Sequence, residues 1–308
     1  FSIFSRIIIS LTLSAGHAVA FIWGAYGIST GAVTFGMMTA FLQLVGQIQR
    51  PLMELSQTIP GMIHALASVD RIIEIEDLPS EKADESVMLE GAVGVRLENV
   101  CFAYPDSVSD VLSDFSYDFA PGSRTAIVGP TGVGKSTLIR LLLSLLHQRS
   151  GEISLYSADG VVNVPVSAAT RRNLVYVPQG NSLFSGTIRD NLLVGNPDAT
   201  EQQMLEALHT AAADFVQELP YGIDTQCFEK GAGLSEGQAQ RIDIARALLR
   251  PGRILLLDEF SSALDAQTET LLLERLTATR SDRTMIFISH RDRVIDFCDA
   301  TLSISKEG

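Results

Sequence analysis

The apolar residues divide the chain into two parts with different patterns. From Ile7 to Gln49 there are 43 consecutive residues without Lys, Arg, Asp or Glu. Ile7–Tyr26 is long enough for one membrane-spanning helix. GISTGAV (27–33) predicts a short turn, and a second apolar segment runs from about Thr34 past Pro51. We therefore expect two membrane helices joined by a turn; the alternatives are a buried helical hairpin of a soluble protein and a signal peptide.

Polar residues in this first part indicate which surfaces the helices present. The second segment is interrupted by Gln43, Gln47, Gln49, Ser56 and Gln57. Such a pattern is typical of a helix that faces a water-filled path or partner helices. His17 lies inside the first span, where an ionisable residue is a functional candidate; a neutral, packed histidine is the alternative. Arg6 and Arg50/Arg71 place both charged ends on one side, which the positive-inside rule makes cytoplasmic.

The second part alternates short apolar runs with helical patterns. The runs are bounded by turn residues: RTAIVG (124–129), NLVYVPQ (173–179), RILLLDE (253–259) and TMIFISH (284–290). Helical patterns occupy 135–147, about 201–217, 236–249 and 266–279. This alternation predicts an α/β domain with a mostly parallel sheet buried on both faces. TLSISKEG (301–308) predicts a strand and turn, an arm of a hairpin whose partner strand is missing.

Charge separates the same regions. The chain of 308 residues carries a net charge of −13; residues 1–69 net +1, so the remainder nets −14. We expect the last part of a transmembrane domain with two helices in 1–69, an acidic linker in 70–92 and a soluble domain in 93–308. So acidic a surface argues against nucleic acid as a partner. The three cysteines lack CxxC spacing, which supports neither a disulfide framework nor a zinc site.

A phosphate-binding pattern follows the first of the predicted strands. GPTGVGKST (129–137) matches G-x-x-x-x-G-K-[ST] between a strand and a helix. Backbone amides of such a loop surround phosphate oxygens, the lysine reaches the β- and γ-phosphates, and the following hydroxyl ligates Mg²⁺. The predicted ATP-binding residues are therefore Gly129, Pro130, Thr131, Gly132, Val133, Gly134, Lys135, Ser136 and Thr137.

Two carboxylates end another predicted strand. ILLLDE (254–259) places Asp258 and Glu259 directly after an apolar run. Mg²⁺ prefers oxygen ligands and keeps several waters, so Asp258 is the expected metal partner, acting through water. Glu259 is then expected to polarise the water that attacks ATP. The alternative is a solvated acidic strand end.

With these motifs in order along the chain, the sequence resembles an ATP-binding cassette transporter of the exporter type. LSEGQ (234–238) resembles the signature motif, and SSALD (261–265) resembles the D-loop. LFSGTIRDNL (183–192) and TQCFEKG (225–231) resemble segments that face the membrane domain. The resemblance implies an α/β nucleotide-binding domain with a parallel-rich sheet and a helical signature subdomain, preceded by two transmembrane helices.

The resemblance also assigns roles to single residues. It implies that Tyr104 stacks on adenine, that Gln179 senses Mg²⁺, and that His290 contacts the γ-phosphate. Catalysis would then involve Glu259, His290, Gln179 and Lys135, and Mg²⁺ would be held by Ser136, Gln179 and Asp258. In this family two nucleotide domains pack head to tail. Ser235, Gly237, Gln238 and Asp265 would accordingly serve the dimer contact and the partner's ATP.

Four residues depart from the family pattern. Glu236 stands where the signature motif usually has glycine, and Phe228 replaces a usual glycine before it. Phe260 follows the expected base, where a small residue or proline is common. Asp243 stands where the signature helix normally carries a small apolar residue. None of these removes an expected catalytic group.

The sequence thus predicts an ATP-hydrolysing exporter half-transporter that works with a second copy or a homologous half-transporter. Its expected location is a cell membrane of the bacterial inner-membrane type, multi-pass, with the nucleotide-binding domain in the cytoplasm. Two spans cannot enclose a substrate path, so we expect a C-terminal portion cut at both ends, and the transported substrate stays unknown. The alternatives are a non-transporting cassette ATPase in mechanical or DNA-repair work and a membrane-anchored ATP binder without turnover.

Overall fold

The computed structural model divides the chain into two compact units, residues 1–80 and 81–308. It describes residues 2–77, 81, 85–105, 107, 109–228, 231, 233–278 and 282–305. The side chains of 2–10, 52–53, 56–57 and 59–60 are outside the description. The predictions made for Arg6, Ser56, Gln57 and parts of 225–231 and 301–308 therefore concern undescribed positions.

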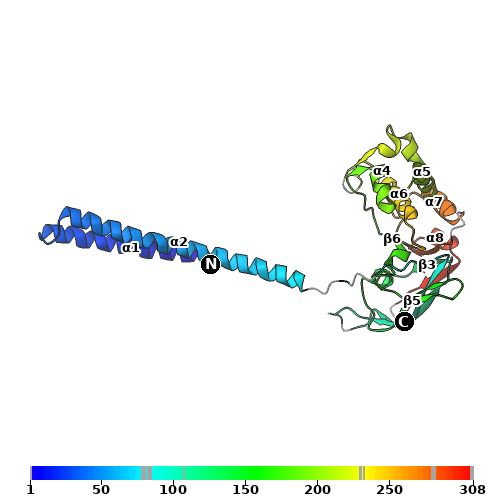
Figure 1. The fold of residues 1–308 in the computed structure, drawn as a ribbon, viewed down its shortest axis with the longest axis horizontal. Coiled ribbons are helices and arrows are strands. Elements are labelled where there is room, and N and C mark those ends of the chain that lie inside the picture. Colours follow the sequence, from blue (N-terminus) through cyan, green and yellow to red (C-terminus); the bar gives the residue numbers. More distant parts are fainter. Residues whose placement is uncertain are drawn as a thin grey trace. The chain divides into compact units, whose positions relative to one another are not determined.

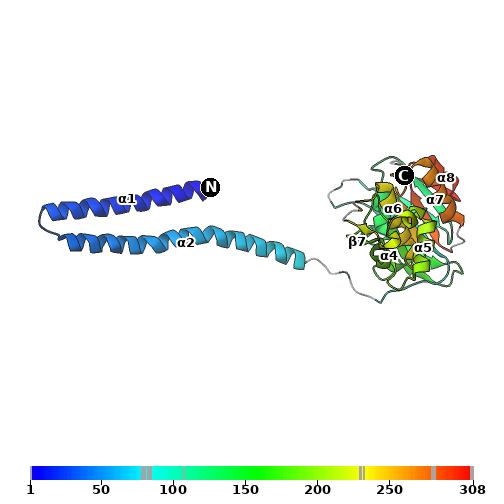
Figure 2. The ribbon, with the colours of Figure 1, turned by 90° about the horizontal axis from the view of Figure 1, so that it is seen from above.

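The first unit is a hairpin of two helices, α1 (Ser2–Ser29) and α2 (Phe35–Glu76), which lie side by side in both views (Figures 1 and 2). Thr34 caps α2, because its hydroxyl accepts a hydrogen bond from the Met37 amide at 3.3 Å. Gly24 allows close packing: a Cβ there would lie 2.5 Å from Met38 Cγ. Near the far end of the contact, Gln49 Nε2 donates to the Leu13 carbonyl at 2.9 Å.

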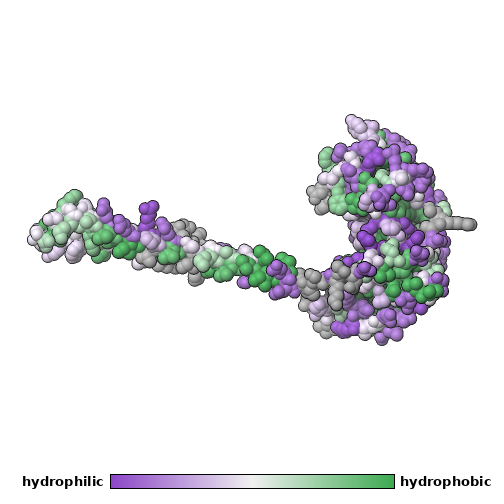
Figure 3. All heavy atoms as spheres, viewed as in Figure 1, coloured by the Kyte–Doolittle hydropathy of each residue, from purple (hydrophilic) through white to green (hydrophobic). Residues whose placement is uncertain are grey.

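Many of the exposed side chains on this hairpin are apolar, with polar ones between them (Figure 3). Among the described residues, one stretch, Leu11–Ser29, is long and apolar enough to cross a membrane. Trp23 and Ile22 in that stretch are more than half exposed. The second predicted span, in α2, does not pass the same test, so it stays a prediction. Its backbone nevertheless forms one helix that continues through Pro51 to Glu76.

The helix α2 also extends into the segment expected to be linker. Residues 70–76 are helical, although they are rich in charge. Charged residues such as Glu and Arg are good helix formers, and the first Pro or Gly after residue 70 is Pro79. The helix therefore continues through the charged residues, which have high helix propensity. It ends at Glu76, with Asp77 as its C-cap, and not where the sequence changes from apolar to charged.

A five-stranded parallel sheet forms the centre of the second unit. Its strand order is β11 (Ala300–Ser303), β3 (Arg124–Val128), β10 (Thr284–Ile288), β9 (Ile254–Asp258) and β6 (Leu174–Val177), and every pairing is parallel. Alternate residues face two different cores: Leu255 and Leu257 pack into one cluster, Ile254 and Leu256 into the other. This confirms the predicted α/β fold with a sheet buried on both faces.

The prediction for the C-terminal strand was wrong in one respect. β11 is not a hairpin arm without a partner, because it pairs in parallel with β3 from Ala300↔Thr125 to Ser303↔Val128. A hairpin requires an adjacent strand in the sequence, whereas a parallel pair is made by strands far apart. Local sequence patterns do not indicate this pairing, because the partner strand β3 lies 175 residues earlier in the sequence.

Two further layers complete this unit. A four-stranded antiparallel sheet has the order β2 (Leu112–Phe119), β1 (Val93–Phe102), β4 (Ser150–Ser157) and β5 (Asn163–Pro165). It shares a core with α3 (Lys135–Leu142). The other face of the parallel sheet carries α4 (Ile188–Gly195), α5 (Glu201–Thr210), α6 (Glu236–Leu249) and α7 (Ala266–Ala278), grouped in one lobe of Figure 1.

The remaining elements are short. They are the paired strands β7 (Gly186–Thr187) and β8 (Gln226–Cys227), helix α8 (Asp292–Asp296), and 3₁₀ turns at Arg171–Asn173, Asp214–Glu218 and Gly222–Asp224. Two predicted helices are shorter than expected. The helix expected over 135–147 ends at Leu142, and Ser144 has φ +52°. The helix expected over 201–217 ends at Thr210, since Ala212 has φ +52°.

Asp243 provides a buried ionic contact inside the helical lobe. Its carboxylate, 2% exposed, pairs with Arg246 one turn later on α6. It also accepts hydrogen bonds from the amide of Ser182 at 3.0 Å and from its hydroxyl. Arg246 in turn donates to the Ser182 carbonyl. The residue that departs from the family pattern thus fastens α6 to the loop after β6.

We expect Asp243→Ala to destabilise the second unit, because Arg246 and the Ser182 amide would lose their buried acceptor. Removing one partner of such a pair costs about 3–5 kcal/mol, roughly a 10 °C lower Tm for a unit of this size. Thermal unfolding of the full chain in detergent measures the effect. The exposed Asp198→Ala serves as control; equal melting temperatures for both variants would contradict the assignment.

Candidate nucleotide-binding site

The site lies where four parallel strands end. Gly129 follows β3, Gln179 comes two residues after β6, Glu259 follows β9 and His290 comes two residues after β10. Because these strands are parallel neighbours, their carboxyl ends share one edge of the sheet, where ligands bind in open α/β sheets. The structure thus brings together residues that span more than 150 positions of the sequence.

The loop between β3 and α3 depends on glycine. Gly132 and Gly134 have φ +81° and +110°, a region that other residues seldom adopt. Gly129 is confined by contact as well, because a Cβ there would lie 2.3 Å from the Ile304 carbonyl oxygen. Thr131 and Gly132 are exposed at the tip, and Gly134 is the N-cap of α3. Exposed amides at a helix N-terminus fit a phosphate group.

Lys135 is enclosed by the loop and is only 8% exposed. Its Nζ donates to the carbonyls of Gly129 at 2.5 Å and Pro130 at 3.0 Å, and lies 3.3 Å from His290 Nε2. Burial lowers the pKa of Lys135, while the nearby carboxylates of Glu259 and Asp258 oppose that shift. The ammonium is therefore pre-positioned between the loop and the strand ends.

Two residues next to Lys135 differ in exposure. The Ser136 side chain is exposed, so its hydroxyl is accessible from solvent. Thr137 is buried, and its hydroxyl lies 3.2 Å from the hydroxyl of Tyr104. The half-buried Tyr104 ring meets Phe102 edge to face, with centroids 5.0 Å apart. Tyr104 is thus anchored beside α3, and its predicted stacking on adenine stays a prediction.

The two acidic residues occupy different environments. Asp258 accepts a hydrogen bond from the Tyr176 hydroxyl at 3.1 Å. Burial raises the pKa of Asp258, the neighbouring Glu259 charge adds to this, and Tyr176 and Lys135 oppose it. Burial and the same carboxylate raise the pKa of Tyr176 to about 12, so the phenol stays a donor. Sequence reasoning missed Tyr176, although it is the one polar group in the strand LVYV.

Glu259 lies at the centre of a polar chain. Its Oε2 accepts a hydrogen bond from Gln179 Nε2 at 2.5 Å, and its Oε1 lies 3.6 Å from His290 Nε2. The backbone of Glu259 has φ +45°, rare for a residue with a side chain, and its amide donates to the Ile288 carbonyl at 2.9 Å. Such a conformation costs about 1–3 kcal/mol and persists only where surrounding contacts hold it. An unbroken series of side-chain contacts therefore connects Lys135, His290, Glu259 and Gln179.

The signature segment begins α6. Ser235 is its N-cap: Ser235 Oγ accepts from the Gln238 amide, and Gln238 Oε1 accepts from the Ser235 amide at 2.9 Å. Ser235 and Glu236 are exposed, while Gly237 is buried. A Cβ on Gly237 would lie 2.8 Å from the Ala263 carbonyl oxygen, so glycine is required for packing within the chain. The role predicted for these residues toward a partner's ATP stays a prediction.

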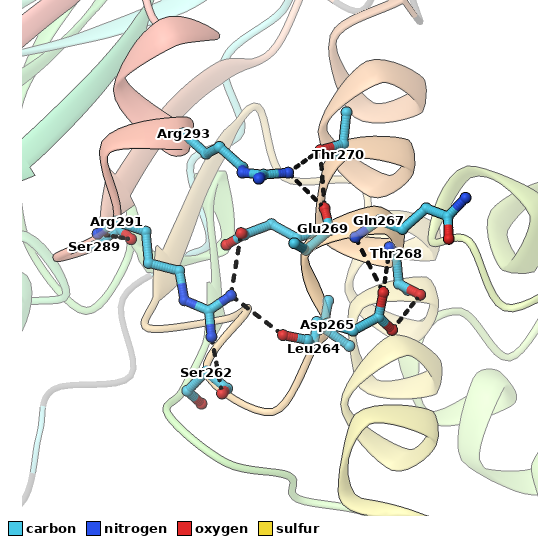
Figure 4. A network of polar contacts seen from close by, with 11 residues as sticks. Ser262, Leu264, Asp265, Gln267, Thr268, Glu269, Thr270, Ser289, Arg291 and Arg293 are labelled. Carbon is cyan, nitrogen blue, oxygen red and sulfur yellow. Dashed lines mark hydrogen bonds and ion pairs between the residues drawn. The ribbon is translucent and has the colours of Figure 1, made fainter.

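The other departures from the family pattern have structural consequences. Phe260 is fully buried and packs on Phe287 with ring centroids 5.5 Å apart, so it belongs to the core. Phe228 is 61% exposed. Asp265 caps α7, since its carboxylate accepts from the amides of Gln267 and Thr268, both at 3.0 Å (Figure 4). The neighbouring residues 229–230 and 232 lie outside the described part.

No group of three or more His, Cys, Asp or Glu side chains that could hold a metal ion occurs among the described residues. The donor set at the strand ends is of another type. It combines the exposed Ser136 hydroxyl with the Asp258 carboxylate beside a phosphate-type loop. Such a set fits Mg²⁺, which uses one or two protein ligands together with substrate phosphates and water.

Comparison with known proteins agrees with this geometry. Residues 112–262 match the family model described as ABC transporter. The chain is 36% identical over 292 residues to the fatty acid ABC transporter ATP-binding/permease protein of Mycobacterium bovis, covering 94% of this chain and 46% of that protein. It is 32% identical over 299 residues to the probable multidrug resistance ABC transporter ATP-binding/permease protein YheI of Bacillus subtilis, covering 96% and 50%.

A solved structure is also similar. The structure titled as a bacterial Atm1-family ABC exporter with ATP bound has a TM-score of 0.71 and 34% identity, covering 98% of this chain and 53% of that one. The chain thus spans about half the length of the relatives that it matches. The matches include the helical hairpin as well as the nucleotide-binding unit, and they support ATP binding and a membrane location. Residues 112–262 of this chain thus match the ABC transporter family.

Proposed function

We propose that this chain serves ATP-driven export, with residues 93–308 as the nucleotide-binding domain and ATP hydrolysis as its reaction. The observation that carries the proposal is the contact set at the sheet edge, where Lys135, His290, Glu259 and Gln179 meet below a phosphate-type loop. An ammonium, a carboxylate, an imidazole and an amide at one point suit phosphoryl transfer to water.

In this proposal each residue acts on a defined part of ATP. The amides of the 129–134 loop and the Lys135 ammonium hold the phosphate oxygens. The Glu259 carboxylate orients a water molecule and accepts its proton as the water oxygen bonds to the γ-phosphorus. The bond from that phosphorus to the β,γ-bridging oxygen breaks, leaving ADP and phosphate. Gln179 and His290 keep the carboxylate in place through the contacts described above.

Mg²⁺ would be held by the Ser136 hydroxyl, by Asp258 through water, and by Gln179. When bound, the ion neutralises phosphate charge in the transition state. Asp258 is suited to this position because the Tyr176 hydroxyl fixes one of its oxygens. Tyr104, anchored beside α3 at Thr137, would supply the stacking surface for adenine.

A second nucleotide-binding domain, from another copy or a homologous half-transporter, would complete the site. The exposure of Ser235 and Glu236 at the start of α6 leaves that helix end accessible to a phosphate of the partner's ATP. Ser235, Gly237, Gln238 and Asp265 would form this contact. The exposed apolar surface of α1 and α2 would face the lipid bilayer and further membrane helices, giving a multi-pass protein with a cytoplasmic nucleotide domain.

Two alternatives are less well supported. A soluble cassette ATPase in mechanical or DNA-repair work does not require a helix that could cross a membrane, such as Leu11–Ser29. The negative net charge also disfavours binding to nucleic acid. An ATP binder without turnover has no use for a strained carboxylate held by both Gln179 and His290.

We expect Glu259→Gln to keep ATP binding but to lower turnover by about 10²–10⁴-fold, because a positioned base contributes that much. The amide retains the shape of the side chain and loses the ability to accept a proton. Steady-state phosphate release by the full chain measures turnover, and a fluorescent ATP analogue measures affinity. Glu274→Gln, an isosteric change at an exposed position of α7, is the control. Turnover of Glu259→Gln within threefold of wild type would remove it from this role.

We expect Lys135→Ala to weaken nucleotide binding, whereas Ser235→Arg should leave affinity within about twofold and prevent ATP-dependent dimer formation. The reason is that Lys135 acts on its own chain's phosphates, while bulk and charge at 235 fill the position of a partner's phosphate. Nucleotide titration and light scattering with and without Mg-ATP test both variants. If Ser235→Arg weakens binding as much as Lys135→Ala, residue 235 belongs to its own chain's site.

A further inference from the structure

Arg291, the residue after His290, fastens the loop of residues 261–265 (the D-loop) to the end of β10 (Figure 4). Its guanidinium donates to the carbonyl of Leu264 through Nη1 and to that of Ser262 through Nη2, both at 3.2 Å. The same group pairs with the Glu269 carboxylate on α7 at 3.1 Å. One side chain therefore joins the end of β10 to the D-loop and to α7, which directly follows the D-loop in the sequence.

Glu269 is the buried partner of Arg291 in this contact. Its side chain is 2% exposed, and its Oε1 has no hydrogen-bond partner among the described residues. A carboxylate in so dry a place is stable only next to a cation. Its amide also donates to the Asp265 carbonyl at 2.9 Å, where α7 begins. The Arg291–Glu269 pair thus fixes the far end of the D-loop.

The near end of the D-loop is attached to Glu259. The Ser262 amide donates to the Glu259 carbonyl at 3.1 Å, and Gln240 Nε2 on α6 lies 3.4 Å from the same oxygen. Gly237 packs directly against the Ala263 carbonyl from the other side. These contacts surround the backbone that carries Glu259 at φ +45°. A displacement of the D-loop would release that backbone from its rare conformation.

We propose that Arg291 is a positioning residue for hydrolysis: it holds the D-loop against the strand end that carries His290, and so keeps the Glu259 carboxylate beside the His290 imidazole. The inference rests on the ATP hydrolysis proposed above. Arg291 itself touches neither Lys135 nor the 129–134 loop through any described contact, so its effect is on the carboxylate and not on nucleotide affinity. Misplacing a reacting group by about 1 Å can cost on the order of 10²-fold in rate.

The test compares Arg291→Ala with Arg293→Ala in the full chain. Arg293 is the matched control, because it also reaches α7, donating at 2.9 Å to the Ala266 carbonyl and to the Thr270 hydroxyl, but it bonds no carbonyl of the D-loop (Figure 4). We expect kcat of Arg291→Ala to fall about 10–100-fold with nucleotide affinity within about twofold. Arg293→Ala should keep kcat within about twofold. Equal kcat in both variants would overturn the proposal.

A second variant separates positioning from stability, since Arg291→Ala leaves Glu269 buried and unpaired. Arg291→Leu combined with Glu269→Leu removes both charges, which is often neutral for stability. We expect this double variant to melt close to wild type while kcat stays low. Recovery of kcat together with melting temperature would show that Arg291 only compensates Glu269, and would overturn the proposal.

A third variant tests whether Arg291 acts through Glu259. Adding Arg291→Ala to Glu259→Gln should lower single-turnover phosphate release by less than about threefold, because residues that act as a unit are not additive. A full multiplicative loss would contradict the proposal. If Glu259→Gln lowers turnover below that of the wild type and Arg291→Ala does not, this inference alone is overturned. Turnover that survives Glu259→Gln overturns both this inference and the proposed role of Glu259.

Discussion

The candidate site depends on one constraint, the parallel pairing of β3, β6, β9 and β10. The carboxyl ends of neighbouring parallel strands lie at the same edge of the sheet. The residues that directly follow these strands are therefore close together. The pairing is stabilised by two apolar cores, to which alternate residues of the same strands contribute. Packing of Leu255 and Leu257 on the helical side and of Ile254 and Leu256 on the other therefore decides where Glu259 lies. The position of the polar residues at the site thus depends on the burial of apolar residues in the strands.

Charged groups in this unit are buried as partners rather than singly. Lys135 has the carbonyls of its own loop and the two strand-end carboxylates; Asp258 has a phenol. Asp243 has Arg246 and Ser182, and Glu269 has Arg291. Asp258, Asp243 and Glu269 each also bond a residue of another segment, since a buried ion must be satisfied by whichever group the fold brings near it. The interior charges thus connect the site to the helical lobe.

The local patterns of the sequence were sufficient for the main elements. The apolar runs at 124–129, 173–179, 253–259 and 284–290 contain the four strands, because a strand buried on both faces needs a continuous apolar run. The phosphate loop was also predictable, since it depends on residues within a few positions. Helix ends were less accurate: α3 and α5 stop early at residues with positive φ, which propensity does not indicate.

Tertiary structure decided what depends on distant residues. The sequence alone did not indicate that β11 pairs with β3, that Tyr176 donates to Asp258, or that Gly237 is required by Ala263. Nor did it assign a role to Arg291, whose three acceptors lie 22–29 positions away on other segments. A sequence motif predicts only the local structure of its own residues. Contacts between motifs are set by the packing of strands and helices, and so they appear only when the chain is folded.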